Sequence, residues 1–370
     1  MTSGGDLYAF VERYSALGEH RTGTAVDEAT RELVAAELER RGATVTRASY
    51  EFDRYDATAT VTVGDRNVGC VPLFYSGSGS VTTAAPYVAA LEMLGGVAAL
   101  DLAERRADAR TAGAEVAVLA TGDGEGRLVA ENVVPEADAG PLTVLVAGSD
   151  CARVAEGPTT VEMVARVVPG HSETVLGWFG ADGTPPVVVT TPLSGWFTCA
   201  GERATGIAVA LETATELAAA GLSVLVVATT GHELGHLGAK AWLRADPVEP
   251  RVVLHCGASL AAGVVTNGVC ELSEARIAMT NVEPGRLDRL AEILARVRIT
   301  AIPGPATWGG EGEEWRRFGV PLLSLSGGFE GFHSPDDLPN AVTTPAALAC
   351  VFETVLAAAH LLVDPTTSVG

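Results

Sequence analysis

The most informative part of this sequence is the stretch Val-Leu-Val-Val-Ala-Thr-Thr-Gly-His-Glu-Leu-Gly-His, residues 224–236. Its last five residues match the HExxH zinc motif, which requires His232 and His236 one turn apart on a helix. However, a β-branched apolar run leads into the motif and glycines interrupt it. This context predicts a buried strand that ends just before His232 and Glu233. Ligands of open α/β sheets bind at such strand ends. Both interpretations predict a metal ion, but they name different ligands.

Strands and helices alternate on both sides of this stretch. The predicted strands at 44–52, 187–191, 224–230, 252–255 and 320–326 are interleaved with helical patterns at 25–42, 204–220, 237–245, 286–297 and 346–362. Such alternation predicts an α/β fold with a mostly parallel sheet flanked by helices. Residues 1–57 and 171–370 are therefore predicted to form one domain. Between them, residues 58–170 read as short strands with one helix, which predicts an inserted, smaller β-rich domain that could act as a lid.

Composition narrows the classes of partner. The formal net charge of −21 over 370 residues argues against nucleic acid and against anionic membrane surfaces as partners. The apolar window at 87–103 contains Glu92 and Asp101, so it is not expected to span a membrane. The six cysteines form no CxxC pair, which suits free thiols in a reducing compartment. The amino terminus lacks the pattern of a signal peptide, so we expect a cytoplasmic protein.

Several short motifs lie at the predicted strand ends and helix starts. In chain order they are Arg21-Thr-Gly-Thr24, Pro192-Leu-Ser194, Glu202-Arg-Ala-Thr-Gly206, His232-Glu-Leu-Gly235, His255-Cys-Gly257 and His333-Ser-Pro-Asp336. In order, spacing and placement the chain resembles the M28-type zinc aminopeptidases and their relatives, the glutaminyl cyclases. The resemblance covers residues 15–55 and 185–362. Residues 58–170 more loosely resemble the protease-associated domain that is often inserted there.

The resemblance implies a metal site with an incomplete set of ligands. Glu202, Glu233 and His333 correspond to the ligands of one family metal, and they leave a fourth position open for water or substrate. Pro192 and Gly257 correspond to ligands of the second metal and cannot bind one through a side chain. We therefore expect one Zn²⁺ or similar divalent ion, and at most one.

His232 stands where the family has its general base. A neutral imidazole can accept a proton from bound water, and this activity would fall as the pH drops through the imidazole pKa. His232 could equally be a metal ligand, whereas His236 is expected to cap or pack against the following helix and to point away from the ion. Arg203 could simply pair with Glu202. His255 and Asp336 are further candidates near the metal.

Other candidates surround this site. Ser194 or Cys199 could act as a nucleophile with His232 in metal-free chemistry. Trp196 and Trp308 lie on loops at strand ends and could form an apolar substrate wall. Glu311 corresponds to an acidic position of the family pocket and could bind a substrate amine.

Three hypotheses for function follow. The favoured one is a hydrolase that cleaves an amide or peptide-type bond of a small molecule or short peptide with one metal ion. The second is a metal-independent hydrolase or lyase built on His232. The third is an inactive protein that binds a small molecule or peptide. A homo-oligomer is compatible with each of them.

Overall fold

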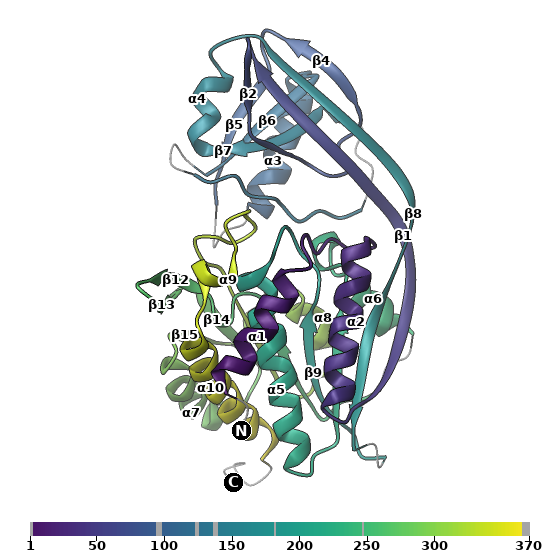
Figure 1. Cartoon of the computed structure of the whole chain (residues 1–370), viewed down its shortest axis with the longest axis vertical. Helices are drawn as coiled ribbons and strands as arrows, with labels where there is room; N and C mark the ends of the chain where they lie inside the picture. Colours follow the sequence, from purple (N-terminus) through teal and green to yellow (C-terminus); the bar gives the residue numbers. More distant parts are fainter. Residues whose placement is uncertain are drawn as a thin grey trace.

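The computed structural model describes residues 3–93, 98–122, 126–135, 140–180, 183–245 and 248–364. A large central sheet dominates the fold (Figure 1). Its strands, from edge to edge, are β15 (Ile299–Pro303), β14 (Arg276–Thr280), β16 (Leu322–Gly327), β11 (Val252–Cys256), β9 (Val187–Pro192), β10 (Val224–Thr229), β8 (Thr159–Phe179), β1 (Thr44–Val63) and β2 (Arg66–Val68), and β4 (Gly79–Thr83) pairs with β8.

The centre of this sheet is parallel. β16, β11, β9 and β10 run in the same direction, whereas β8 is antiparallel to β10 and β14 is antiparallel to β16. From β9 the chain passes first to β10 on one side and later to β11 on the other side. The strand order therefore reverses between β9 and β11, and such a reversal opens a crevice at the carboxyl ends of the strands.

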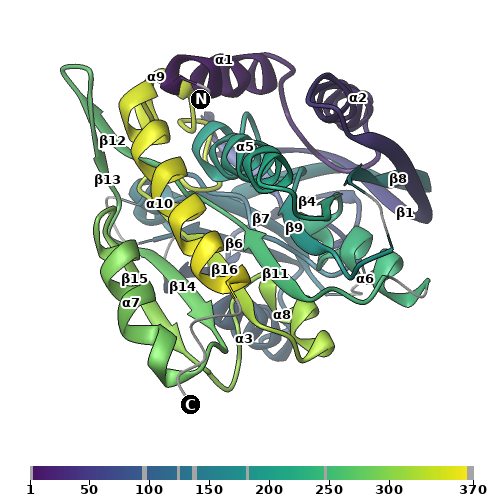
Figure 2. The same cartoon turned by 90° about the horizontal axis from the view of Figure 1, so that it is seen from below.

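The parallel strands are buried on both faces, as their uninterrupted apolar sequences predict. On one face, Val189, Val226 and Leu254 belong to a core shared with the covering helices, and Figure 2 shows α5 and α10 side by side over this face. These helices are α1 (Gly4–Ser15), α2 (Ala25–Arg40), α5 (Thr205–Ala219), α7 (Pro284–Ala295) and α10 (Pro345–Val363). On the other face, α6 (Leu237–Arg244) and the short α8 (Gly312–Trp315) contribute Trp242 and Trp315 to a second core.

Among the described residues, one helix is long and apolar enough to cross a membrane, and it is α10 rather than the 87–103 window. Its most apolar window is 56% buried. It contacts α1, α5 and α7, and Leu348, Val351 and Val355 are completely buried in the main core. Its apolar composition is therefore explained by its place in the core.

The inserted residues form a separate sheet above the central one (Figure 1). Its strand order is β3 (Cys70–Pro72), β7 (Leu142–Ala147), β6 (Val116–Thr121) and β5 (Tyr87–Leu91), and it carries α3 (Ala99–Thr111) and the short α4 (Cys151–Val154). β1 and β8 pair over 20 residues and form a long ribbon that joins the two sheets. Both strands run through the predicted boundaries at 58 and 170, which stay a prediction, as does the role of a lid.

The predicted helices of the large domain and its strands from 187 onward are confirmed within a few residues, whereas the strand predicted at 44–52 continues to Val63 as β1. The mostly parallel sheet flanked by helices is confirmed as well. The inserted part contains short strands and the helix α3, which packs against β5 and β6, and its strands β5, β6 and β7 are parallel. The sequence indicated short strands but did not show that β5, β6 and β7 run in the same direction.

Candidate functional site

The candidate site lies at the carboxyl ends of the parallel strands. Three loops meet there: residues 193–199 after β9, residues 230–236 after β10, and residues 328–337 after β16. The first loop leads into a π-helical turn, Ala200–Ala204, through Cys199, whose backbone is left-handed at φ 49°. This edge of the sheet contains the reversal between β9 and β11, where open α/β sheets bind ligands.

At the centre of the site, Glu202 contacts two buried partners. Its Oε1 lies 2.7 Å from Nη2 of Arg203 and 3.0 Å from Nε2 of His333, and all three side chains are completely buried. Burial alone would raise the pKa of Glu202, but the Arg203 guanidinium and His333 outweigh burial, so this pKa is lowered. Glu202 is therefore a carboxylate at neutral pH, and its expected pairing with Arg203 is confirmed.

The other ring nitrogen of His333 fixes its tautomer. Nδ1 lies 3.0 Å from the carbonyl oxygen of Ala130, which can only accept, so Nδ1 carries a proton. Nε2 is therefore the ring nitrogen that faces the carboxylate of Glu202. The amide of Ala130 also donates to the carbonyl oxygen of His333 at 2.9 Å, so residues 126–135 of the inserted part cover this corner.

Asp337, which the sequence analysis did not name, holds the turn that carries Glu202. Its carboxylate accepts from the amides of Gly201 (2.5 Å) and Glu202 (3.0 Å). Burial raises the pKa of Asp337 to about 7, against the effect of these two hydrogen bonds. Asp336, the predicted candidate, is exposed and pairs with Arg127 at 2.8 Å. The predicted position was wrong by one residue, because the sequence does not show which of two adjacent aspartates faces inward.

Glu233 is held away from Glu202 by other donors. One carboxylate oxygen accepts from the amide of Thr22 and the other from the hydroxyl of Ser194, both at 2.7 Å. The same hydroxyl accepts from the amides of Gly231 (2.8 Å) and His232 (3.2 Å). Ser194 therefore has no capacity left to act as a nucleophile, and it joins the loop after β9 to the loop after β10 instead.

His232 forms a second histidine–carboxylate pair, with Glu311. Nδ1 of His232 lies 3.6 Å from Oε2 of Glu311, and the other oxygen of Glu311 accepts from the hydroxyl of Thr229 at 2.7 Å. Burial lowers the pKa of His232 well below its ordinary value, and the charge of Arg203 adds to this effect. Burial raises the pKa of Glu311, although His236, the bond from Thr229 and Arg203 act in the opposite direction. His232 is thus a neutral imidazole at physiological pH.

The HExxH interpretation fails on backbone geometry. β10 ends at Thr229, residues His232–Leu234 form a single 3-10 turn, and His236 itself is left-handed at φ 65°. The two histidines are therefore not on one helix. His236 was expected to cap or pack against the following helix; it directly precedes α6, and its ring centroid lies 4.9 Å from that of His232. Its Nδ1 contacts Glu314 at 3.2 Å.

The remaining candidates divide between core and site. Cys199 is completely buried, its thiol donates to the carbonyl oxygen of Trp196 at 2.6 Å, and burial raises its thiol pKa well above the ordinary value. It is therefore a thiol and not a nucleophile at neutral pH. Trp308 packs in the second core beneath β16 and is 7% exposed, which argues against a substrate wall. Trp196 packs against Phe74 of the inserted part at 5.0 Å between centroids.

His255 lies at the end of β11 beside the His232 pair. It is buried, and a Cβ on Gly312, next to Glu311, would be 3.6 Å from its ring. Burial lowers the pKa of His255 to about 3, with smaller effects from His236 and Arg203. His255 therefore enters the site as a neutral ring.

A set of buried polar atoms in this site has no hydrogen-bond partner among the described residues. Nearly all buried polar groups in proteins are hydrogen-bonded, and exceptions gather at functional sites. The atoms are Oε1 of Glu202, Nη1 and Nη2 of Arg203, Nδ1 of His232, Nδ1 of His255, Oε2 of Glu311 and Nε2 of His333. Arg203 is near enough to lower the pKa of both His232 and Glu311, so these atoms belong to one electrostatic cluster. We name it the polar cluster.

The donors that are brought together do not fit the expected zinc ion. Within the parts of the chain that the structure describes, no three His, Cys, Asp or Glu side chains are grouped to hold a metal. Glu202 and His333 meet, but the two carboxylate oxygens of Glu233 already accept hydrogen bonds from Thr22 and Ser194. The position beside Glu202 is held by the fixed charge of Arg203. The single zinc ion stays a prediction, against which these contacts argue.

Comparison with solved structures identifies the fold. A zinc aminopeptidase from Bacillus subtilis aligns with 97% of this chain and 95% of its own, with a TM-score of 0.72 and 16% identity. An M28 peptidase precursor from Shewanella amazonensis aligns over 97% and 93%, with a TM-score of 0.77 and 15% identity. The glutaminyl cyclase of Porphyromonas gingivalis aligns over 96% and 97%, with a TM-score of 0.52 and 13% identity. No protein-family model and no curated protein matches the chain.

Proposed function

This chain has the fold of the M28 zinc aminopeptidases and glutaminyl cyclases, and from that premise we propose that it is a metal-independent enzyme that hydrolyses an amide bond of a small substrate. His232 is its general base, Glu311 orients His232, and Arg203 stabilises the developing oxyanion. The solved neighbours include peptidases and a cyclase, which support chemistry at an amide carbonyl.

One observation carries the proposal: the polar cluster combines an unprotonated imidazole with a buried guanidinium that pairs with Glu202 through Nη2 and whose Nη1 has no hydrogen-bond acceptor among the described residues. A buried charge with unused donors is costly unless a ligand completes its contacts. Donors that point at the position where charge develops, in a site without bulk water, are a major source of catalysis. We therefore infer that the polar cluster binds the carbonyl group of a substrate.

The reaction is written with these residues alone. A water molecule attacks the amide carbonyl carbon while its proton passes to the free ring nitrogen of His232. The carbonyl electron pair moves onto oxygen, where it faces the guanidinium of Arg203. When the tetrahedral intermediate collapses, the carbon–nitrogen bond breaks and the leaving amine takes the proton from His232. The products are a carboxylic acid and an amine.

The charges of the cluster favour this sequence of events. In the free site, burial and Arg203 keep His232 neutral, as a base must be. As the oxyanion forms beside Arg203, it offsets the cation that opposes protonation of His232. The base therefore becomes stronger as the reaction proceeds. Glu202 and the carbonyl oxygen of Ser194 hold Arg203 in place.

The test is a turnover assay on protein that has been dialysed against a chelator. Amino-acid amides, N-acyl amino acids and an N-terminal glutaminyl dipeptide are incubated with the protein, and products are measured by mass spectrometry. We expect turnover of at least one class without added metal. His232→Gln should lower that turnover by roughly 10²–10⁴-fold while the melting temperature stays unchanged.

The matched control is His171→Gln, because His171 is an exposed histidine on β8 outside the site. It should keep full turnover. The proposal is wrong if no class of amide is cleaved, if the chelator abolishes turnover, or if His232→Gln is as active as the parent. Activity that returns only with zinc would restore the metal-dependent hypothesis.

A further inference from the structure

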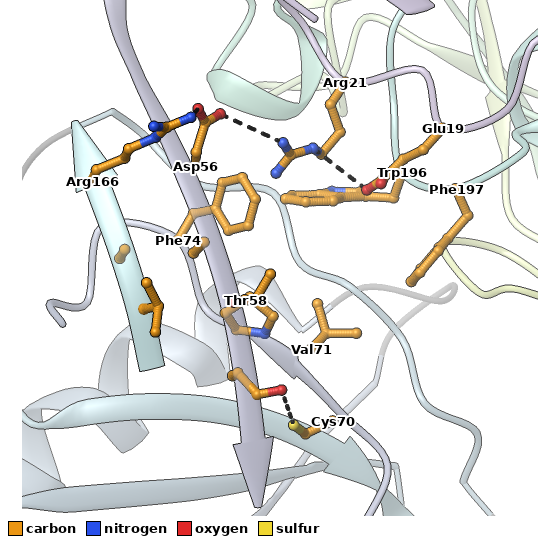
Figure 3. Close-up of a pocket in the computed structure, with 15 residues that line it drawn as sticks. Glu19, Arg21, Asp56, Thr58, Cys70, Val71, Phe74, Arg166, Trp196 and Phe197 are labelled. Atoms are coloured by element: carbon orange, nitrogen blue, oxygen red, sulfur yellow. Dashed lines mark hydrogen bonds and ion pairs between the residues drawn. The ribbon is translucent and has the colours of Figure 1, made fainter. Parts of the chain in front are cut away.

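A large cavity lies where the inserted part meets the loops at 19–21 and 196–197, and the proposed reaction does not use it (Figure 3). Its volume is about 720 Å³, which is within the range of small-molecule sites. Its walls come from the β1–β8 ribbon, from residues 70–74 of the inserted part, and from the loops at 19–21 and 196–197. Phe74, Val164, Trp196 and Phe197 provide apolar surface.

Two arginines and two carboxylates line one side of the cavity: Arg21, Arg166, Asp56 and Glu19. Arg54, which lies outside the lining, binds both carboxylate oxygens of Asp56 at 2.9 Å each. Arg166 and Arg21 approach Asp56 only to 3.4 Å and 3.9 Å. Asp56 is therefore already neutralised by Arg54, and the two lining arginines are held less tightly.

Arg21 is the guanidinium with the weakest contacts in this group. Its side chain makes two long ion pairs, 3.4 Å to the half-exposed Glu19 and 3.9 Å to Asp56, and no hydrogen bond to any described residue. It lies 4.6 Å from the centre of the Phe74 ring, and Figure 3 shows it between Glu19 and Asp56. A planar guanidinium held against a ring, with free N–H groups, suits two-point recognition of a carboxylate.

The cavity is next to loops that lead into the polar cluster, although no residue of the cluster lines it. Beyond Arg21 and Phe74 lies a small hollow of about 10 Å³ that Glu233 also lines, which is roughly the space of one water molecule. Thr22, next to Arg21, donates to Glu233. Trp196 is part of the same loop as Cys199, whose thiol donates to its carbonyl oxygen. The loops that border the cavity are thus the same loops that lead into the residues of the polar cluster.

We propose that this cavity recognises the substrate by its carboxylate and apolar side chain, with Arg21 binding the carboxylate and Phe74, Trp196 and Phe197 enclosing the apolar group. The substrate class is an amide whose amine half is an apolar amino acid with a free carboxylate. This inference rests on the proposed hydrolysis for the statement that the ligand is a substrate. The binding itself is a property of the cavity and is measurable without turnover.

The experiment is calorimetric titration of the His232→Gln protein, which prevents turnover. The two probes are N-acetyl-L-phenylalanine, which carries a carboxylate, and its neutral amide, N-acetyl-L-phenylalaninamide. We expect the carboxylate probe to bind roughly tenfold or more tightly, as a hydrogen bond to a charged group contributes. Adding Arg21→Gln should remove this preference, and Glu19→Gln should strengthen it because a competing carboxylate is gone.

Arg244→Gln is the matched control, since Arg244 is exposed at the end of α6. It should bind both probes as the parent does. If Arg21→Gln fails to fold, Arg166→Gln gives the same test at a side chain that is 73% exposed, with a smaller loss expected. Equal affinity for the two probes, no binding of either, or a preference that survives Arg21→Gln overturns the inference. If the titrations succeed while the parent protein cleaves no amide, the cavity assignment stands and the proposed hydrolysis fails.

Discussion

Two histidine–glutamate pairs lie at the same edge of the sheet and differ in their surroundings. His333 and Glu202 are 3.0 Å apart, completely buried, and tied to Arg203 and to the carbonyl oxygen of Ala130. His232 and Glu311 are 3.6 Å apart, and the side chain of His232 keeps 11% of its surface exposed. Both side chains of the first pair are fully buried, and we call it the closed pair. His232 of the second pair keeps some exposed surface, and we call that the open pair.

The difference separates a supporting role from a chemical one. In the closed pair, charge is balanced by fixed neighbours, so a change of protonation would leave an uncompensated buried charge. In the open pair, the imidazole is neutral and loosely held, so it can gain and lose a proton during turnover. The account therefore assigns rigidity to His333 and Glu202, and proton transfer to His232.

The largest expected effect follows from removing the cation of the closed pair. Arg203→Met would leave Glu202 as a buried carboxylate with one partner fewer, and breaking such a pair costs about 3–5 kcal/mol. The free energy of unfolding in urea should fall by about this amount. Arg203→Met combined with Glu202→Gln should recover part of the loss, because the charge is then absent. A single variant as stable as the parent would show that the closed pair does not support the fold.

A smaller effect is expected from the neutral ring of His255, beside the open pair. Its pKa is lowered from 6.5 to about 3, so the unfolded chain takes up a proton below 6.5 while the folded protein does not. The contribution to stability is therefore complete above 6.5 and is lost as the pH falls toward 3. Between about pH 7 and about pH 5 one such group changes the free energy of unfolding by about 2 kcal/mol.

His255→Gln should flatten the pH dependence of urea unfolding by that amount. His20 offers a parallel outside the cluster, since burial lowers its pKa to about 3 as well and it stacks on Tyr14 at 3.7 Å. His20→Gln should flatten the curve to the same extent. If His20→Gln flattens the pH dependence and His255→Gln leaves it unchanged, the surroundings of His255 are more hydrated than its burial indicates.

The smallest effect is expected at His236. Its contact with Glu314 at 3.2 Å is partly exposed, and such pairs contribute about 1 kcal/mol or less. His236→Ala should therefore change the free energy of unfolding by no more than this, and turnover should remain close to that of the parent. A loss of activity as large as that of His232→Gln would show that both histidines act together, as in the HExxH interpretation.

The sequence predicted the strand–helix order well because apolar periodicity is a local property. It also placed Glu202, His232 and His333 near one another, because the carboxyl ends of parallel strands share one edge of the sheet. It did not predict that Glu233 would be bound by Thr22, which is 211 residues away along the chain. That contact depends on how the loop before α2 folds over the sheet.

Two further parts of the site were beyond sequence reasoning. Ala130 fixes the tautomer of His333 through a backbone carbonyl, which any residue type provides, so no motif marks it. Arg21 belongs to the large part of the fold and Phe74 to the inserted part. They meet because the β1–β8 ribbon brings the inserted sheet over the large one. In the sequence, Arg21 belongs to the motif Arg21-Thr-Gly-Thr24, which does not indicate a cavity.

The central claim is that Arg203, and not a metal ion, supplies the positive charge of this site. The most direct test is elemental analysis of protein purified without added ions, followed by calorimetric titration with zinc. The account predicts far less than one equivalent of zinc per chain and no tight binding in the titration. One tightly bound equivalent that is lost in His333→Ala would contradict it, because Glu233 would then have to leave Thr22 and Ser194 and join Glu202 and His333 as a ligand.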